Sequence, residues 1–401
     1  MPERSYSHII IGGGLAGAAP IEGIRQHDST GSILLISAEQ DPPYDRPPLS
    51  KKLWTGAKRV EDIFLHPQSF YTQHAIELKL ATEVTSLDLA GHLVRDRSGN
   101  SFSYTKLLLA TGGTPRHLTI PGGDLKGLSY YRTLNDYHEV RTSAASGKSA
   151  VVIGGGFIGS EMAASLCVNG VSVTMVFPDE WLVSRVFPES LGRALTDYYR
   201  SKGIGVLTQD APTSIEQSTN GYVVHTRNGQ HCNADLVIIG IGILPNISLA
   251  QAAGLKTDNG IAVDELLRAS HPDVYAAGDV AFFPDQVLGP RRIEHWDNAI
   301  SQGKQAGRNM AGANEPFTEM PFFFSDLFEF GYEAVGNVDS RLETFADWQE
   351  ANKTGVIYYL DEARRVRGAM MCNVWDKVDA ARTLIRRAQP MRVEDLRNAI
   401  R

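Results

Sequence analysis

Residues 8–17 read HIIIGGGLAG, a short apolar strand that runs directly into glycines at the start of a helical stretch. The spacing is G-x-G-x-x-G, in which a backbone free of side chains turns sharply and approaches a pyrophosphate at the helix N-terminus. A second apolar strand at 33–36 closes the unit, and Glu39 follows 22 residues after Gly17. A carboxylate at about this distance accepts hydrogen bonds from adenosine ribose hydroxyls. The stretch therefore predicts a β-α-β unit that binds a dinucleotide.

The same pattern recurs at residues 150–159, which read AVVIGGGFIG. A helical stretch and an apolar strand at 171–177 follow, and Asp179 lies 20 residues after Gly159. One glycine-rich loop can match the motif by chance, but here motif, strand context and acid spacing coincide twice. The sequence therefore predicts two dinucleotide-binding units of the α/β class.

The composition excludes several classes of protein. Of 401 residues, 42% are apolar and 21% charged, which is typical of a soluble globular chain of two or three domains. A net charge of -7 argues against a nucleic-acid-binding protein. No apolar run approaches the ~18 residues of a membrane span, and the N-terminus lacks a signal-peptide pattern. We therefore expect a soluble, cytoplasmic protein with no membrane span.

Three cysteines, at positions 167, 232 and 372, stand far apart in the sequence. They form neither a CxxC pair nor a metal-ligand cluster, so neither a redox disulfide nor a metal site is predicted. We expect three small buried thiols.

Further glycine-terminated strands follow the two fingerprints. Residues 107–113 read LLLATGG, residues 236–246 read LVIIGIGILPN, and residues 274–279 read VYAAGD. Taken alone, each segment is a buried strand that ends in a turn. In this order they resemble the FAD-dependent pyridine nucleotide-disulfide reductase superfamily, from Ile10 to about Asn309.

One branch of that superfamily is similar in more detail. RPPLSK at 46–51 and EHW at 294–296 resemble the ferredoxin reductases of oxygenase systems and the apoptosis-inducing factor-like flavoproteins. FSD at 324–326 and GYEAVG at 331–336 resemble the C-terminal domain of the same branch. The resemblance covers nearly the whole chain.

The resemblance implies an α/β fold with two Rossmann-like dinucleotide-binding domains, one for FAD and one for NAD, plus a C-terminal α+β domain. The FAD domain is expected to be discontinuous, at 1–116 and 246–318. The NAD domain is expected at 117–245 and the C-terminal domain at 319–401.

The C-terminal domain reads as strands at 355–360 and 366–374, followed by a helix at 376–388. Its many aromatic residues are expected to form core. In the first unit, Pro20 falls about six residues into the expected helix, where it removes an amide donor and predicts a kink.

By resemblance, the first fingerprint binds FAD and the second binds the nicotinamide dinucleotide. Glu39 lies on the ribose, Arg46 and Lys51 lie toward the pyrophosphate and flavin, and Asp279 lies at the ribityl chain. The residues expected to contact one cofactor or the other are Gly12, Gly14, Leu15, Ala16, Gly17, Glu39, Arg46, Lys51, Val84, Ala110, Thr111, Gly112, Arg132, Gly154, Gly156, Phe157, Ile158, Gly159, Glu161, Asp179, Gly242, Gly278, Asp279, Glu294, His295 and Trp296.

Lys51 and Glu161 are the expected catalytic residues. A lysine near the flavin stabilises the negative charge gained on reduction, and a carboxylate holds that ammonium and positions the nicotinamide. Without the resemblance, Lys51 reads as a solvated lysine and Glu161 as a first-turn acid favoured by the helix dipole. Similarly, Trp296 either covers the flavin or packs in a domain interface, and we favour the flavin face.

Thiol-relay chemistry is excluded by residue type, because no cysteine precedes residue 167. The expected enzyme takes electrons from NADH into FAD and passes them to a [2Fe–2S] ferredoxin or another one-electron acceptor. The alternative is a slow, apoptosis-inducing factor-like NADH oxidase whose reduced state remodels a binding or dimer surface. A homodimer stays open in either case.

The acids after the second nucleotide-binding strand favour NADH over NADPH. Asp179 and Glu180 stand where a 2′-phosphate would lie and would repel it. The nearest basic residue in the sequence, Arg185, lies six positions beyond Asp179.

Overall fold

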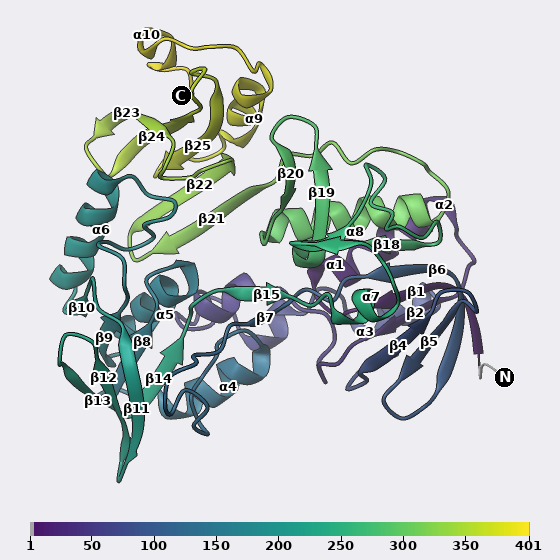
Figure 1. Cartoon of the computed structure of the whole chain (residues 1–401), viewed down its shortest axis with the longest axis horizontal. Helices are drawn as coiled ribbons and strands as arrows, with labels where there is room; N and C mark the ends of the chain where they lie inside the picture. The colour runs from purple at the N-terminus through teal and green to yellow at the C-terminus, as the bar shows by residue number, and fades with distance from the viewer. Residues whose placement is uncertain (1–3, 401) are drawn as a thin grey trace. The chain divides into compact units, whose positions relative to one another are not determined.

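The computed structural model describes residues 4–400, and the chain forms two compact units. The first unit comprises the chain up to Arg46, Val60–Thr114 and Leu244–Pro321, and the second comprises Pro47–Arg59, Pro115–Ile243 and Phe322–Arg401. The chain crosses between the units on either side of Pro47–Arg59, within β7 (Gly113–Pro115), within β15 (Ile243–Pro245) (Figure 1) and after Pro321.

The first unit is built on a mostly parallel sheet with the strand order β3-β2-β1-β6-β5-β4, in which β18 also pairs with β6. Every residue of β2 is buried, as expected for a parallel strand covered on both faces. Its strands are β1 (Arg4–Ile11), β2 (Ile33–Ile36), β3 (Ile76–Lys79), β4 (Val84–Asp88), β5 (Leu93–Asp96), β6 (Ser101–Leu109) and β18 (Val274–Ala276).

Alternation along β1 divides the core of this unit into two layers. Ile10 packs with residues of α1 (Leu15–Ala18), α2 (Pro20–His27) and α8 (Trp296–Met310). Ile9 and Ile11 face the opposite layer, which includes residues of α7 (Ser248–Ala252). The sheet therefore lies between two covered faces, as a doubly wound fold requires.

The helix after the first fingerprint is interrupted where Pro20 predicted a kink. α1 ends at Ala18, and Pro20 occupies the first position of α2, where its missing amide hydrogen is tolerated. α2 also lies close to α8, because a Cβ built on Gly307 would lie 2.3 Å from the Pro20 carbonyl oxygen.

The remaining elements of the first unit lie around its sheet. A four-stranded sheet has the order β16-β17-β19-β20. These elements are η2 (Val60–Ile63), α3 (Gln68–Gln73), β16 (Thr257–Asp258), β17 (Gly260–Ala262), η3 (Gly278–Val280), β19 (Ala281–Asp285) and β20 (Gly289–Arg292).

The second unit contains a parallel sheet with the order β10-β9-β8-β14 and an antiparallel sheet with the order β11-β12-β13. Its elements up to Ile243 are η1 (Pro47–Ser50), α4 (Leu134–Ser143), β8 (Ser149–Ile153), α5 (Phe157–Val168), β9 (Ser172–Val176), α6 (Glu189–Ser201), β10 (Gly205–Leu207), β11 (Pro212–Ser218), β12 (Gly221–Thr226), β13 (His231–Ala234) and β14 (Leu236–Ile239).

The C-terminal part of the second unit is an antiparallel sheet with the order β21-β22-β25-β24-β23. Phe323, Phe330 and Tyr332 are buried, which confirms the expected core for these three aromatic residues, whereas Phe322, Phe324 and Phe328 are only partly buried. The predicted strands and helix are present within two residues. The elements are β21 (Phe322–Leu327), β22 (Phe330–Gly336), β23 (Glu343–Glu350), β24 (Thr354–Leu360), β25 (Val366–Cys372), α9 (Val378–Arg386) and α10 (Val393–Leu396).

Pro47–Arg59, which is expected from the sequence in the FAD domain, groups with the second compact unit. It is tied to α5 by hydrogen bonds from Ser165 Oγ to the Ser50 carbonyl (2.6 Å) and from Asn169 Nδ2 to the Trp54 carbonyl (3.1 Å). The α/β fold class is confirmed, whereas the three-domain division stays a prediction.

Candidate functional site

The glycines of the first fingerprint lie at the carboxyl end of β1 and fall into two kinds. A Cβ on Gly12 would lie 2.1 Å from the Ala110 oxygen, and one on Gly17 would lie 1.8 Å from the Gly12 oxygen. Gly12 therefore permits close approach to the end of β6, and Gly17 permits close packing of α1 against the end of β1. Gly14 is different, because a Cβ there would meet only Arg46 Nη2, at 4.0 Å. The space before Leu15 and Ala16, which begin α1, therefore fits a pyrophosphate at a helix N-terminus.

The carboxyl ends of neighbouring strands meet at this fingerprint. A Cβ on Gly278, which follows β18, would lie 2.6 Å from Ala16 Cβ, and its amide donates to Gln302 Oε1 (2.9 Å). Thr111, between Ala110 and Gly112 at the end of β6, donates from Oγ1 to the Asn246 carbonyl at 2.8 Å. This edge is where open α/β sheets bind their ligands.

Glu39 is held by two neighbours from the loop after β2. The Tyr44 hydroxyl donates to Glu39 Oε2 at 2.5 Å, and the Arg46 guanidinium forms an ion pair with Glu39 Oε1. Since Arg46 Nη2 also lies in front of Gly14, its guanidinium connects the carboxylate predicted to bind ribose with the start of α1.

Other predicted FAD contacts lie at element ends. Glu294 forms an ion pair with Arg292 at 2.6 Å, and burial lowers the pKa of His295 to about 4. Trp296 begins α8, and its indole Nε1 donates to Asp45 Oδ1 at 2.7 Å. Asp279 lies in η3, after β18. Val84 is the first residue of β4 and packs, partly buried, against the core layer that contains Ile9 and Ile11.

In the second fingerprint, at the end of β8, two glycines are again closely packed and one borders open space. A Cβ on Gly154 would lie 2.4 Å from the Gly240 oxygen, and one on Gly159 would lie 2.0 Å from the Gly154 oxygen. Around Gly156, no described atom comes within 4 Å of a built Cβ. Phe157 and Ile158 form the first turn of α5, and Ile158 is exposed. The space at Gly156 therefore fits a second dinucleotide phosphate.

The acids in the loop after β9 have a cationic partner on α6, Arg193, that the sequence alone did not reveal. Asp179 and Glu180 are exposed, and Arg193 Nη2 pairs with Glu180 at 2.6 Å. Arg193 also pairs with Glu189 at 2.8 Å, so two carboxylates share this one guanidinium. Arg193 lies on α6, 13 residues after Glu180. No local sequence pattern predicts an ion pair over that separation.

Two predicted contacts lie in loops of the second unit. The Gly242 carbonyl accepts from the Arg116 amide at 2.9 Å, and Gly242 has a φ of +95° that favours glycine. The Arg132 amide donates to Asp136 Oδ2 at 2.9 Å, beside the capping box of α4.

Lys51 and Glu161, 110 residues apart in sequence, form a buried ion pair with Nζ and Oε1 separated by 3.2 Å. Their side chains are 11% and 7% exposed, so Lys51 is no solvated surface lysine and Glu161 no exposed first-turn acid. Lys51 Nζ also lies 4.6 Å from the centre of the Phe324 ring. The catalytic assignment of the pair stays a prediction.

All three cysteines lie in the second unit, with Cys167 near the C-terminal end of α5. Cys372 is fully buried, but Cys167 and Cys232 are only half-buried, so the expectation of three buried thiols was right for one of them. Burial raises the pKa of Cys167 and of Cys232. Cys167 Sγ contacts the Lys202 carbonyl at 3.4 Å.

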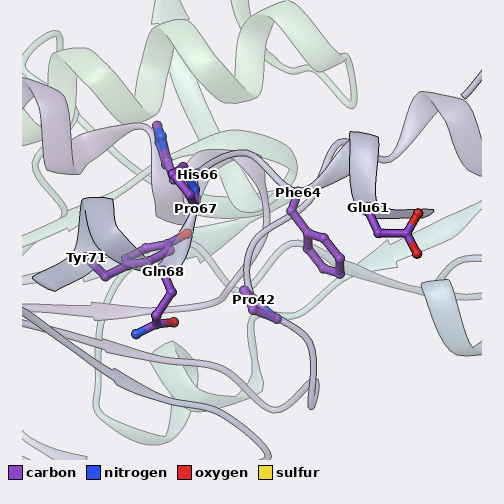
Figure 2. Close-up of a pocket in the computed structure, with 7 residues that line it drawn as sticks. All are labelled: Pro42, Glu61, Phe64, His66, Pro67, Gln68 and Tyr71. Atoms are coloured by element: carbon purple, nitrogen blue, oxygen red, sulfur yellow. The ribbon is translucent and has the colours of Figure 1, made fainter. Parts of the chain in front are cut away.

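A pocket of about 380 Å³ lies in the first unit, beside the loop that carries Pro42 (Figure 2). None of the residues predicted to bind a cofactor lines it. The lining residues are Pro42, Glu61, Phe64, His66, Pro67, Gln68 and Tyr71.

Over residues 4–400, no helix is both long and apolar enough to cross a membrane. In the same part of the chain, no group of three histidine, cysteine or acidic residues is arranged to hold a metal ion.

Comparison with known proteins places these features in a family. Residues 6–303 match the family model described as pyridine nucleotide-disulphide oxidoreductase. Residues 306–354 match the C-terminal model of mitochondrion-associated apoptosis-inducing factor.

Individual proteins are similar over nearly the whole chain. Apoptosis-inducing factor 1 from Dictyostelium discoideum is 33% identical, covering 98% of this chain and 80% of its own. The ferredoxin–NAD(+) reductase component of an anthranilate 1,2-dioxygenase system from Burkholderia cepacia is 32% identical, covering 94% and 93%. The crystal structure of a covalent putidaredoxin reductase–putidaredoxin complex matches with a TM-score of 0.91 and 30% identity, covering 98% and 95%. The chain belongs to the pyridine nucleotide-disulphide oxidoreductase family, and it is an FAD-dependent NAD(P)H oxidoreductase.

Proposed function

We propose that this flavoprotein takes a hydride from NADH and passes single electrons from FAD to a [2Fe–2S] ferredoxin-type protein. The observation that carries the proposal is the absence of cysteine from the sequence before residue 167, where thiol-relay members of the family hold their redox cysteine. The segment instead supplies Lys51, paired with Glu161. Relatives named as a ferredoxin reductase component and as a putidaredoxin reductase complex support a protein acceptor.

The chain's own residues have distinct tasks in this proposal. FAD, when bound, accepts a hydride and releases its electrons one at a time. Gly14 and Arg46 bind its pyrophosphate, Gly12 provides the tight turn before it, and Glu39 orients the adenosine ribose. Lys51 holds a positive charge toward the ring, where negative charge develops, and Glu161 keeps that ammonium in place.

We also propose NADH as the preferred donor. Asp179 and Glu180 place negative charge at the end of β9, and the nearby Arg193 is already paired with Glu180 and Glu189. A 2′-phosphate would meet repulsion from the carboxylates and no unpaired guanidinium from Arg193. The ratio of kcat/KM for NADH and NADPH tests this, and a higher value for NADPH contradicts it.

A second candidate function is a slow NADH oxidase whose reduced state remodels a binding or dimer surface. It is favoured by the match of residues 306–354 to the apoptosis-inducing factor C-terminal model. It predicts a long-lived reduced complex with NAD and a change of oligomeric state on reduction, measurable by light scattering.

The proposed function is tested by steady-state turnover with NADH, with and without a [2Fe–2S] ferredoxin, using cytochrome c as the final acceptor. We expect cytochrome c reduction to depend on ferredoxin. The triple variant Cys167→Ser, Cys232→Ser, Cys372→Ser should keep the same rate per folded, FAD-loaded molecule. Turnover that is unaffected by ferredoxin, or lost with the thiols, contradicts direct electron transfer.

A further inference from the structure

Glu161 is a buried carboxylate held by donors from separate segments of the second unit. Ser50 Oγ donates to Oε2 at 2.5 Å, and Ser325 Oγ donates to Oε1 at 2.5 Å. Lys51 Nζ donates to the same Oε1 at 3.2 Å. The residues come from η1 and the turn that follows it, from α5, and from β21. A buried carboxylate needs such partners, because burial without them strongly disfavours its charge.

The two hydroxyls act as donors by necessity, since an ionised carboxylate can only accept hydrogen bonds. Ser50 and Ser325 are 3% and 2% exposed, so water does not readily replace either one. Hydrogen bonds to charged groups are shorter and stronger than neutral ones. Each carboxylate oxygen therefore has a fixed direction, set by one buried serine.

Fixing the carboxylate also fixes Lys51. The ammonium lies between Glu161 Oε1 and the face of Phe324, the residue before Ser325 on β21. Lysine otherwise carries a flexible four-carbon stem and a point charge that tolerates many positions. Through Phe324 and Ser325, one strand thus contacts both members of the ion pair.

We propose that Ser325 and Ser50 are positioning residues that hold the Glu161 carboxylate, and through it the Lys51 ammonium, in the orientation required for hydride transfer. The inference rests on the proposed function, in which Lys51 lies at the flavin ring. It gives the C-terminal sheet a direct part in the reductive half-reaction, because Ser325 lies on β21.

The test compares Ser325→Ala and Ser50→Ala holoenzymes with wild type. The anaerobic rate constant for flavin reduction by saturating NADH is expected to fall about tenfold in each, the scale of a hydrogen bond lost from a charged group. The midpoint potential of bound FAD is expected to become more negative, because a displaced ammonium stabilises the reduced ring less. Ser325→Thr, which keeps a hydroxyl, is expected to restore both values.

Ser149→Ala is the matched control. Ser149 Oγ also donates to a carboxylate of the second unit, Asp235 Oδ2 at 2.9 Å, at the start of β8. Its removal should leave the reduction rate and the potential unchanged, although it deletes the same kind of bond.

The outcomes separate the inference from the proposed function. If Glu161→Gln lowers the rate and shifts the potential while Ser325→Ala and Ser50→Ala match wild type, the serines do not position the pair. If Lys51→Met and Glu161→Gln also match wild type, the proposed role of the pair is wrong as well. If Ser325→Ala fails to fold, Ser50→Ala and Ser325→Thr still decide, since a wild-type Ser50→Ala enzyme contradicts the inference.

Discussion

At the scale of single residues, substitutions at corresponding glycines of the two fingerprints should affect the binding of FAD and of NADH separately. Among residues 4–400, and apart from their chain neighbours, built Cβ atoms on Gly14 and Gly156 meet no atom closer than 4.0 Å. Gly14→Val should therefore fold but lose FAD, because the side chain fills the pyrophosphate space. Gly156→Val should keep FAD and raise the KM for NADH. Flavin release after denaturation and steady-state kinetics measure the two effects.

Gly17→Ala is the control for Gly14→Val and Gly156→Val, because it tests packing instead of cofactor space. Its Cβ would lie 1.8 Å from the Gly12 oxygen. It should lower the free energy of unfolding by about 1–3 kcal/mol or more, as overpacking does. A Gly14→Val protein that keeps stoichiometric FAD contradicts the assignment of the first fingerprint.

His295 predicts a pH dependence of stability. Burial lowers its pKa to about 4, whereas an unfolded histidine titrates near ~6.5. Between these values the unfolded chain binds a proton that the folded chain does not, so the free energy of unfolding falls as pH falls. From pH 7 to 5 this residue contributes a loss of about 1–2 kcal/mol. Urea titrations of wild type and His295→Gln measure it, and equal pH slopes in the two proteins contradict it.

Variants of Trp296 test whether its ring only packs in the core or also contacts the flavin. Its indole N–H donates a hydrogen bond to Asp45, and its ring packs against the core layer that contains Ile10. Trp296→Phe keeps most of the apolar ring but loses the hydrogen bond, whereas Trp296→Ala loses both. We expect both variants to change the flavin absorption spectrum and to slow electron delivery to a one-electron acceptor more than reduction by NADH. Native spectra and native rates in both half-reactions support packing alone.

At the scale of elements, α2 and α8 pack through glycine. Gly307 lies against the Pro20 carbonyl, and Gly23 lies against the Lys304 carbonyl, where a built Cβ would be 2.2 Å away. Gly307→Ala should therefore destabilise the first unit by about 1–3 kcal/mol, because backbone must shift to admit the methyl group. Thermal unfolding measures the change in stability. A Gly307→Ala variant at least as stable as wild type would contradict close packing of α2 against α8.

Local patterns predicted these elements well, because each depends on residues close in sequence. The run at 33–36 is β2, and the helix expected at 376–388 is α9, from Val378 to Arg386. Pro20 marked the break between α1 and α2, because a missing amide hydrogen acts within one helical turn.

At the scale of the whole molecule, the sequence could not show contacts made across long separations. Ser50 and Glu161 are 111 residues apart, and Trp296 and Asp45 are 251 apart. The first of these hydrogen bonds ties Pro47–Arg59 to the rest of the second unit, and the other lies within the first unit. The motifs indicated that Lys51 and Glu161 belong to a site, but not that two serines hold the carboxylate.

Direct transfer of electrons from FAD to a one-electron protein acceptor, as proposed above, is tested by double-mixing stopped flow. The enzyme is reduced anaerobically by one equivalent of NADH and then mixed with a [2Fe–2S] ferredoxin or with oxygen, while flavin absorbance is followed. We expect re-oxidation by ferredoxin to be fast compared with re-oxidation by oxygen and unchanged when the three cysteines are serines. A reduced flavin that persists in the presence of ferredoxin, while the protein changes its oligomeric state, would contradict direct transfer and support the second candidate function.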